Sequence, residues 1–144
     1  VEKEEKPKFD HEKFKELCGE EFKGVYRQSA VNKLIDEKRG HVKNAFYRKE
    51  IGHIDLIWGD ERIGMCHIIA RRKEQDVDPK RVFQNMSDVI QYGISHYNEK
   101  KDNFEIWSPG YLFVVSKTFF GEDIKLVVTG FNKDKKPKWL KEKS

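Results

Sequence analysis

Between residues 39 and 72 the spacing of the apolar residues changes twice, and this constrains the fold more than any other part of the chain. Residues 44–48 and 53–58 are short runs rich in aromatic and β-branched side chains, separated by the sequence KEIG, which predicts a β-hairpin. From residue 63 to residue 75 the apolar residues return to helical spacing. In this run Met65, Cys66, Ile69 and Ala70 form the stripe that we expect to be buried. The chain must therefore combine helices with antiparallel strands.

Helical patterns stand on both sides of this region, and strand patterns follow them. Helices are predicted at residues 11–19, 29–39 and 79–94, the second with Ser29 as its N-cap and Gly40 at its end. A polar turn at residues 98–103 precedes strands predicted at residues 104–107, 111–117 and 124–131. We therefore predict an α+β domain in which N-terminal helices pack on a twisted antiparallel β-sheet, with the hairpin as an addition.

Length and charge indicate one domain with charged ends. A chain of 144 residues suits a single domain, which we place at residues 11–132. Residues 1–10 are a charge run that includes Pro7 and are expected to be disordered. Residues 133–144 hold six lysines against Asp134 and Glu142, so this basic tail carries the whole net charge of +4. The tail is either a solvated, frayed terminus or an electrostatic tether for a phosphate backbone.

Several classes of function lack their sequence signatures. No apolar run approaches the roughly 20 residues of a membrane span, and no signal peptide is recognised, so we expect no membrane partner. The chain begins with Val, which we interpret as a segment of a larger protein or a processed product. Cys18 and Cys66 stand outside any Cys/His ligand spacing and are expected to be free thiols, and no metal or other cofactor is predicted. The GxxxxGK[ST], GxGxxG, HExxH and GxSxG motifs are absent.

His67 is the first candidate for chemistry. Helical spacing places His67, Arg71 and Glu74 together on one face of the predicted helix, away from the apolar stripe. Gly59 and Gly64 are expected to open the N-terminus of this helix, so that its N–H groups can meet an anion. A titratable imidazole beside a guanidinium is what RNA cleavage without a metal requires, because one group moves a proton and the other meets the charge on the phosphate.

Other residues are predicted to complete this site. Arg71 and Arg72 are expected to hold a phosphate, with the head of Arg72 reaching the sheet from the edge of the apolar side. Lys117 and Thr129 on the late strands are expected to join them, although a solvated lysine and an ordinary strand threonine are the alternatives. The predicted substrate-binding residues are His41, Asp55, Trp107 and Lys138, and for Trp107 a core position is the alternative.

The chain resembles a known family of nucleases. The segments RGHVKNAFYR, GHIDLIWGD, HIIARR, NMSDVIQYG, NFEIW, LVVTGF and the closing KKP are similar to the barnase–EndoU–colicin–RelE-like nuclease domains, in the branch found in phage polyvalent proteins and bacterial toxin modules. The resemblance runs from about residue 22 to residue 137. It implies helices against a four-stranded antiparallel sheet. His67, Arg71, Arg72 and Thr129 match the family's site positions and Lys117 aligns with them, whereas His53 stands where the family often has an acidic or polar residue.

The resemblance implies an endoribonuclease toxin that cleaves RNA, such as tRNA, through attack of the 2′-hydroxyl to leave a 2′,3′-cyclic phosphate. Its implied partners are the RNA substrate and a cognate immunity protein or antitoxin. It would act in the bacterial cytoplasm, including as the delivered C-terminal domain of a larger toxin or phage protein. One alternative is a non-catalytic module that binds nucleic acid or protein. Another is an ADP-ribosyltransferase, whose Arg/Ser-Thr-Ser/Glu pattern is not found here.

Because the sequence holds no metal-ligand cluster, RNA cleavage by this chain should survive chelation. Purified protein incubated with labelled total tRNA and excess EDTA should give discrete fragments that end in a cyclic phosphate. Cleavage that stops on chelation and returns with added magnesium would contradict this prediction.

Overall fold

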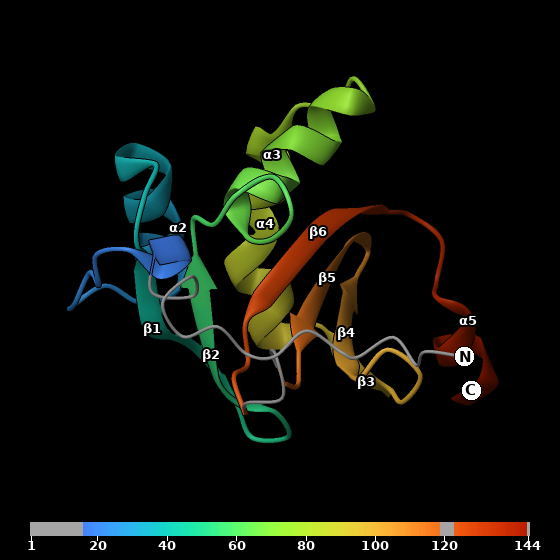
Figure 1. The fold of residues 1–144 in the computed structure, drawn as a ribbon. Coiled ribbons are helices and arrows are strands. Elements are labelled where there is room, and N and C mark those ends of the chain that lie inside the picture. Colours follow the sequence, from blue (N-terminus) through green and yellow to red (C-terminus); the bar gives the residue numbers. More distant parts are fainter. Residues whose placement is uncertain (1–15, 119–122, 144) are drawn as a thin grey trace, which may run out of the picture.

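The computed structural model describes residues 16–118 and 123–143 as two layers, helices on one side and a β-sheet on the other (Figure 1). The chain order is α2 (Arg27–Glu37), β1 (His41–Arg48), β2 (Gly52–Ile57), α3 (Met65–Glu74), α4 (Pro79–Tyr92), β3 (Ile94–Asn98), β4 (Asn103–Ser108), β5 (Gly110–Ser116), β6 (Val127–Lys133) and α5 (Lys138–Lys143). Strands β1 and β2 form an antiparallel hairpin, and the other four form an antiparallel sheet in the order β3-β4-β5-β6. The predicted α+β class and the additional hairpin are confirmed.

Helix α4 lies across one face of the sheet and forms the centre of the core. Its start agrees with the sequence signals, because Pro79 is its first residue and the Asp78 carboxylate accepts a hydrogen bond from the Lys80 N–H at 3.0 Å. Its apolar side packs on β4 and β5, where Phe113 is fully buried. The core shared by helices, hairpin and sheet includes Leu34, Phe46, Ile54, Leu56, Met65, Ile68, Met86, Ile90, Ile106, Phe113 and Val115.

Strand β3 is the element that the residue pattern missed. Ile94 continues the apolar spacing of α4 and was predicted as its last residue, but α4 ends at Tyr92 and Ile94 begins β3. A Cβ on Gly93 would lie 2.5 Å from the Val89 carbonyl oxygen and 2.8 Å from that of Trp107, so the chain can make this close transition only with glycine. The family resemblance implied a four-stranded sheet, which the structure has. The residue pattern predicted only three strands after the helices.

Two other predicted boundaries shift. Helix α2 begins at Arg27 after Tyr26, and Ser29, predicted as its N-cap, lies inside the first turn with its N–H bonded to the Tyr26 carbonyl. The last strand was predicted at residues 124–131 but runs from Val127 to Lys133.

The ends of the chain are described only in part. The predicted disorder of residues 1–10 and most of the helix predicted at residues 11–19 lie outside the described residues, but residues 16–18 are helical and Gly19 ends them at a φ of +64°. The tail predicted at residues 133–144 contains a short helix, α5. Both cysteines are free, Cys18 buried and Cys66 half-buried. Among the described helices, none has the length and apolarity that crossing a membrane takes.

The outer edge of β6 is covered along its first half and at the residues just before it. The Lys125 carbonyl accepts from the Asp55 N–H at 2.8 Å, and the Val128 carbonyl accepts from the Gly64 N–H at 3.1 Å. The Gly130 carbonyl accepts from Arg72 Nη1 at 2.7 Å. An uncovered strand edge is a site of unwanted pairing, so the hairpin and α3 together close this side of the sheet.

A network centred on Arg48 fixes the hairpin to the end of α4. Arg48 Nη1 donates to the carbonyls of Ile90 and Gly93 at 2.9 and 2.7 Å. Its Nε and Nη2 donate to the two oxygens of Glu50, which also accepts from the Ser95 hydroxyl. The hydrogen bonds from Arg48 hold the pKa of the Glu50 carboxyl down at about 2.

Glu50→Gln should lower the stability of the fold at neutral pH. A depressed carboxyl pKa adds stability that is fully present above the unfolded-state value of about 4.3 and is lost as pH falls towards 2. Because the Glu50 side chain is 47% exposed, we expect a loss of only about 0.5–1 kcal/mol at pH 7.

Urea denaturation at pH 7, 4.5 and 3 checks this prediction, and the difference from wild type should be nearly the same at pH 7 and pH 4.5 and smaller at pH 3. Glu99→Gln, at an exposed position in the β3–β4 turn, is the matched control and should change little at any pH. A Glu50→Gln loss that is as large at pH 3 as at pH 7 would show that the network acts through packing and not through charge.

Candidate functional site

The sheet has one face that α2, α3 and α4 do not cover. Directly paired residues of antiparallel strands point to the same face. Phe113 and its partner Ile106 point into the core, so the neighbouring positions point the other way. Two rows of side chains therefore cross the uncovered face, namely His96, Glu105, Val114 and Thr129, and beside them Ile94, Trp107, Leu112 and Phe131.

Helix α3 is rotated from its predicted orientation. Of the predicted stripe of Met65, Cys66, Ile69 and Ala70 only Met65 is confirmed as buried, because the buried residues of α3 are Met65, Ile68 and Arg72. The centre of the observed buried stripe lies about 100° around the helix axis from the centre of the predicted stripe. The reason is that α3 lies along the edge of β6, where a polar head can bond to a backbone carbonyl, so an arginine takes a buried position.

This rotation places His67 and Arg71 on the side of the uncovered face. Ile69 lies about 60° to one side of the buried stripe and packs against the core next to Phe83 of α4. His67 and Arg71 lie about 100–140° to the other side of the stripe, away from α4. Since α4 covers the core face of the sheet, we infer that His67 and Arg71 border the face that carries Thr129.

His67 is held in one tautomer by the backbone. Its Nδ1 lies 2.7 Å from the Glu61 carbonyl oxygen. A carbonyl oxygen only accepts, so Nδ1 carries the proton and Nε2 of the neutral ring is left as the basic nitrogen. The half-buried ring of His67 can therefore take a proton through Nε2.

Arg72 is a buried cation that has no acidic partner among the described residues. It is 3% exposed, and Nη1 bonds to the Gly130 carbonyl while its guanidinium carbon lies 5.6 Å from the centre of the Phe131 ring. Its Nε is buried without a hydrogen-bond partner, and among the described residues no carboxylate pairs with it. Burial and the charge of Arg71 both lower the pKa of the Arg72 guanidinium. A buried charge of this kind attracts an anion.

Arg71 and Thr129 stand beside this cation. Arg71 is exposed and has only a long 3.4 Å contact with Glu74, so its guanidinium can turn to another anion at little cost. Thr129 is half-buried, one residue from the Gly130 carbonyl that Arg72 contacts, and its side chain belongs to the uncovered face. From the contacts of Arg72 with Gly130 and Phe131 we infer that Arg71, Arg72 and Thr129 share one corner of the molecule, with His67 on the same helix.

The N-terminus of α3, which the sequence predicted to be open to an anion, is closed at two of its N–H groups. The Gly64 N–H donates to the Val128 carbonyl at 3.1 Å, and the Cys66 N–H donates to the Trp58 carbonyl at 2.8 Å. A Cβ on Gly64 would lie 2.8 Å from the Ile57 carbonyl oxygen, so this glycine permits close packing and leaves no space for a ligand. The physical reason is that these N–H groups serve to cover β6 and β2.

Lys117 and Trp107 have contacts of their own outside this corner. Lys117 follows β5, three residues beyond Val114, the strand partner of Thr129, which is about 10 Å along the strand. Its ammonium lies 4.8 Å from the centre of the Tyr97 ring. Trp107 is 5% exposed and its indole N–H donates to the Lys133 carbonyl at 2.9 Å. That leaves no ring face on which a base could stack.

His41 and Asp55 belong to the hairpin. His41 Nδ1 bonds to the Cys18 carbonyl oxygen, and Nε2 lies 4.0 Å from Glu21. Asp55 accepts from the Asn44 N–H at 2.8 Å, and burial raises the pKa of its carboxyl. It lines a polar pocket of about 320 Å³ with His53, Asp123 and other residues at the foot of the hairpin. In the described part of the chain, no group of three or more His, Cys, Asp or Glu side chains is arranged to hold a metal ion.

Lys138 is exposed at the start of α5, and the residue after it ties α5 to the sheet. The Trp139 ring stacks on His96 with 4.8 Å between ring centres and 7° between planes. Sequence reasoning missed His96 and its strand partner Glu105, which share the row of Thr129. Their place on this face could have been predicted only if residues 94–98 had been recognised as a strand, because His96 and Glu105 lie on different strands.

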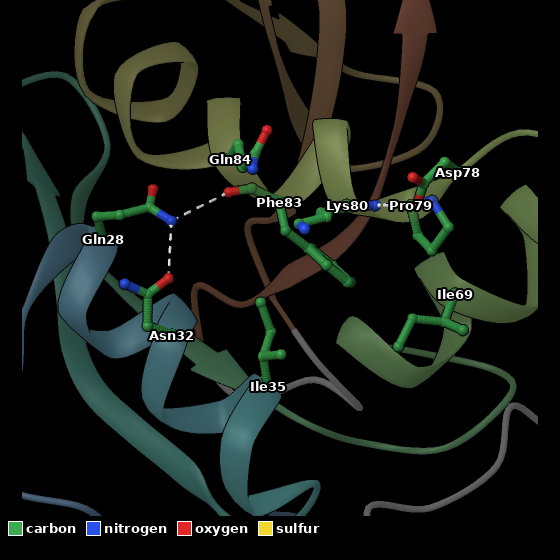
Figure 2. Close-up of a pocket in the computed structure, with 9 residues that line it drawn as sticks. All are labelled: Gln28, Asn32, Ile35, Ile69, Asp78, Pro79, Lys80, Phe83 and Gln84. Carbon is green, nitrogen blue, oxygen red and sulfur yellow. Dashed lines mark hydrogen bonds between the residues drawn. The ribbon is translucent and has the colours of Figure 1, made fainter.

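A second pocket, apolar and about 400 Å³ in volume, opens between α2, α3 and α4 (Figure 2). Ile35, Ile69 and Phe83 form its wall, and the Gln28 side-chain amide bridges Asn32 and the Phe83 carbonyl at its rim. It lies on the helical side of the molecule and contains no histidine or paired arginines, so it does not share the chemistry of the corner at α3.

Comparison with known proteins gives one match. A family model described as phage-Barnase-EndoU-ColicinE5/D-RelE like nuclease1 matches residues 45–137, which is more than half of the chain. The matched range contains His67, Arg71, Arg72, Lys117 and Thr129, and it excludes His41 and Lys138. No curated protein and no solved structure matches the chain.

Arg72→Met should keep the fold and abolish anion binding at the α3–β6 corner. Replacing a buried, unneutralised cation by an apolar side chain of similar length is neutral or stabilising for many proteins, so we expect a change within about 1–2 kcal/mol. Inorganic phosphate should raise the Tm of the wild-type protein and not that of the variant. The reason is that a ligand stabilises the folded state only if the folded state binds it. Arg62→Met, which removes an exposed arginine paired with Asp60, is the control and should keep the phosphate response.

Proposed function

This chain belongs to the family of phage Barnase-EndoU-ColicinE5/D-RelE-like nucleases, and from that membership we propose that it is an endoribonuclease acting through the 2′-hydroxyl of its substrate. The observation that carries this proposal is the buried Arg72, which has an unpartnered Nε, no acidic partner among the described residues and a second arginine beside it. A phosphodiester is the anion that suits two neighbouring guanidiniums.

The roles of the residues follow from their positions. His67 Nε2 accepts the proton of the 2′-hydroxyl, since Nδ1 is bonded to the Glu61 carbonyl. Arg71 and Arg72 bind the scissile phosphate and stabilise the charge that builds on its oxygens. The Thr129 hydroxyl donates a further hydrogen bond from the adjacent strand. Lys117 and Lys138 lie further out and are proposed to contact flanking phosphates.

The proposed reaction is one displacement at phosphorus. The 2′-oxygen loses its proton to His67 and forms a bond to phosphorus, while the bond from phosphorus to the 5′-oxygen breaks. The 5′-oxygen takes a proton from water, and the hydroxide that remains takes the proton from His67, so the products are a 2′,3′-cyclic phosphate and a 5′-hydroxyl end and the neutral imidazole is restored. All of these groups come from the substrate, water and this chain.

The second candidate is an RNA-binding module without catalysis. It is favoured by one observation, that α3 offers a single imidazole and no second acid–base side chain next to it. Under the first candidate, the biological setting that we propose is a phage-encoded or toxin nuclease that acts on RNA in the bacterial cytoplasm and is restrained by a cognate partner.

Incubation with end-labelled tRNA in EDTA separates the two candidates. The nuclease gives discrete fragments with cyclic phosphate ends, whereas the binding module gives a mobility shift and intact RNA. Repeating the reaction on RNA with 2′-O-methyl groups tests the mechanism, because a methylated 2′-oxygen cannot attack. Cleavage of the methylated RNA at the same positions would refute attack by the 2′-hydroxyl.

His67→Ala should reduce the cleavage rate by about 10²–10⁴-fold, the usual contribution of a general base. The fold should be retained, because His67 lies outside the buried stripe of α3. Single-turnover rates and circular dichroism on the same preparation check both statements. His53→Ala, at an exposed position on β2, is the matched control and should cleave at the wild-type rate. Equal rates for the two variants would remove His67 from the mechanism.

The basic tail should contribute affinity and not chemistry. Lys135, Lys136 and Lys138 are exposed, so replacing all three by Gln should weaken RNA binding and reduce the salt dependence by roughly two to three phosphate contacts. Substitution is preferable to deletion because Trp139 stacks on His96. The saturating single-turnover rate should stay unchanged, and a fall in that rate would place the tail in the active site. Gln at Lys23, Lys49 and Lys80 makes the same charge change elsewhere and is the control.

A further inference from the structure

Phe131 is an aromatic side chain on the uncovered face of the sheet that the proposed reaction does not use. It follows Thr129 by two residues on β6, so the two side chains share this face about 7 Å apart. The Phe131 ring is half-buried. Among the described residues, it is not one of the partly buried apolar side chains that pack against either hydrophobic core cluster. Packing in the core therefore does not account for an aromatic ring at this position.

The neighbours of Phe131 in its row are buried. Its strand partner Leu112 is 3% exposed, and Trp107 beyond it is 5% exposed, with its indole N–H bonded to the Lys133 carbonyl. Phe131 is thus the accessible ring at the β6 end of an otherwise buried apolar row. A ring that is packed on one side loses less side-chain freedom when a ligand contacts its open side, so it binds that ligand at a lower entropic cost.

The Phe131 ring also lies beside the cation that we assign to the phosphate. Arg72 Nη1 bonds to the carbonyl of Gly130, the residue between Thr129 and Phe131, and the Arg72 guanidinium carbon lies 5.6 Å from the ring centre. A phosphate bound by Arg72 is therefore next to the ring. In a nucleotide a single sugar joins the phosphate to the base, so a protein that holds both needs a cation and a flat apolar surface side by side. This corner of the molecule has both.

We propose that Phe131 stacks on an unpaired base of the nucleotide whose phosphate Arg72 holds, and that this ring restricts the substrate to single-stranded RNA. The inference rests on the proposed function, because the phosphate site is the one assigned there. Every base has a π-face, so the ring accepts any of them. Bases inside a duplex are already stacked and paired, and only a base that has left the duplex can meet an aromatic side chain. Phe131 is therefore a positioning residue that selects unpaired segments such as loops.

Short nucleic acids that cannot be cleaved test the stacking contact. The probes are labelled 2′-fluoro oligonucleotides of about six nucleotides, a usual site size for a single strand, and abasic chains of the same length and charge. Their binding to the full chain is measured by fluorescence anisotropy. Phe131→Leu should lower the affinity for the base-bearing probe by about 5- to 100-fold, the contribution of one base stacked on an aromatic residue. It should leave the affinity for the abasic probe unchanged, and Phe131→Trp should bind both probes as the wild type does.

Phe104→Leu is the matched control, because Phe104 is also half-buried but packs against the core. It should bind both probes as the wild type does. Equal losses of affinity for the two probes in Phe131→Leu would show that the ring serves only to hold Arg72 in place, and would overturn the proposal. Equal affinity of the wild-type protein for the base-bearing and the abasic probe would overturn it too.

Cleavage assays separate this inference from the proposed function. One RNA sequence is offered as a single strand and annealed to its complement. The single strand should be cleaved at least about tenfold faster, because a base in the duplex must first be unpaired. Equal rates on the two forms would overturn the inference and leave the nuclease assignment standing. Base-dependent binding that Phe131→Leu abolishes, without cleavage of any RNA, would overturn the nuclease and leave the stacking role of Phe131 standing.

Discussion

The burial of the Arg72 guanidinium is the constraint on which the candidate site depends. A charged head next to the edge of β6 is tolerated because the Gly130 carbonyl and the Phe131 ring contact it. That contact sets the rotation of α3, and the rotation in turn directs His67 and Arg71 away from the core. The remaining donor, Nε, has no partner in the described chain. One side chain thus contacts both helix and sheet and keeps one unsatisfied donor, which is where we propose that a phosphate binds.

The two edges of the four-stranded sheet differ in how they are covered. At β6 the hairpin and α3 contact the backbone of the first part of the strand, and the candidate site that we propose there consists of a histidine, two arginines and a threonine. At the other edge, β3 pairs with β4 alone among the described strands. The face between them carries His96, Glu105 and Thr129 in one row, with the basic tail seated at the β3 end.

Local sequence patterns predicted those elements whose signals lie within the element itself. Helix α4 has a cap, a proline at its start and a regular apolar stripe, and the hairpin has two short strands around a turn, so both were predicted correctly. β3 was missed because Ile94 satisfies the helical spacing of α4 equally well, and the transition depends on Gly93 packing against Val89 and Trp107. The α3 stripe was misplaced because hydrophobic periodicity assumes an apolar core, whereas α3 packs on a strand edge that accepts an arginine.

The sequence by itself determined the α+β class, the hairpin, the family, and the grouping of His67 with Arg71, because positions four residues apart on a helix share a face whatever surrounds them. Only the tertiary structure decided which face of α3 is buried, that the Lys117 ammonium lies against the Tyr97 ring, that the N–H groups of Gly64 and Cys66 are bonded to neighbouring carbonyls, and that His96 joins the row of Thr129. Each of these depends on contacts between segments distant in the chain. Spacing within one segment carries no information about the neighbour that it will meet.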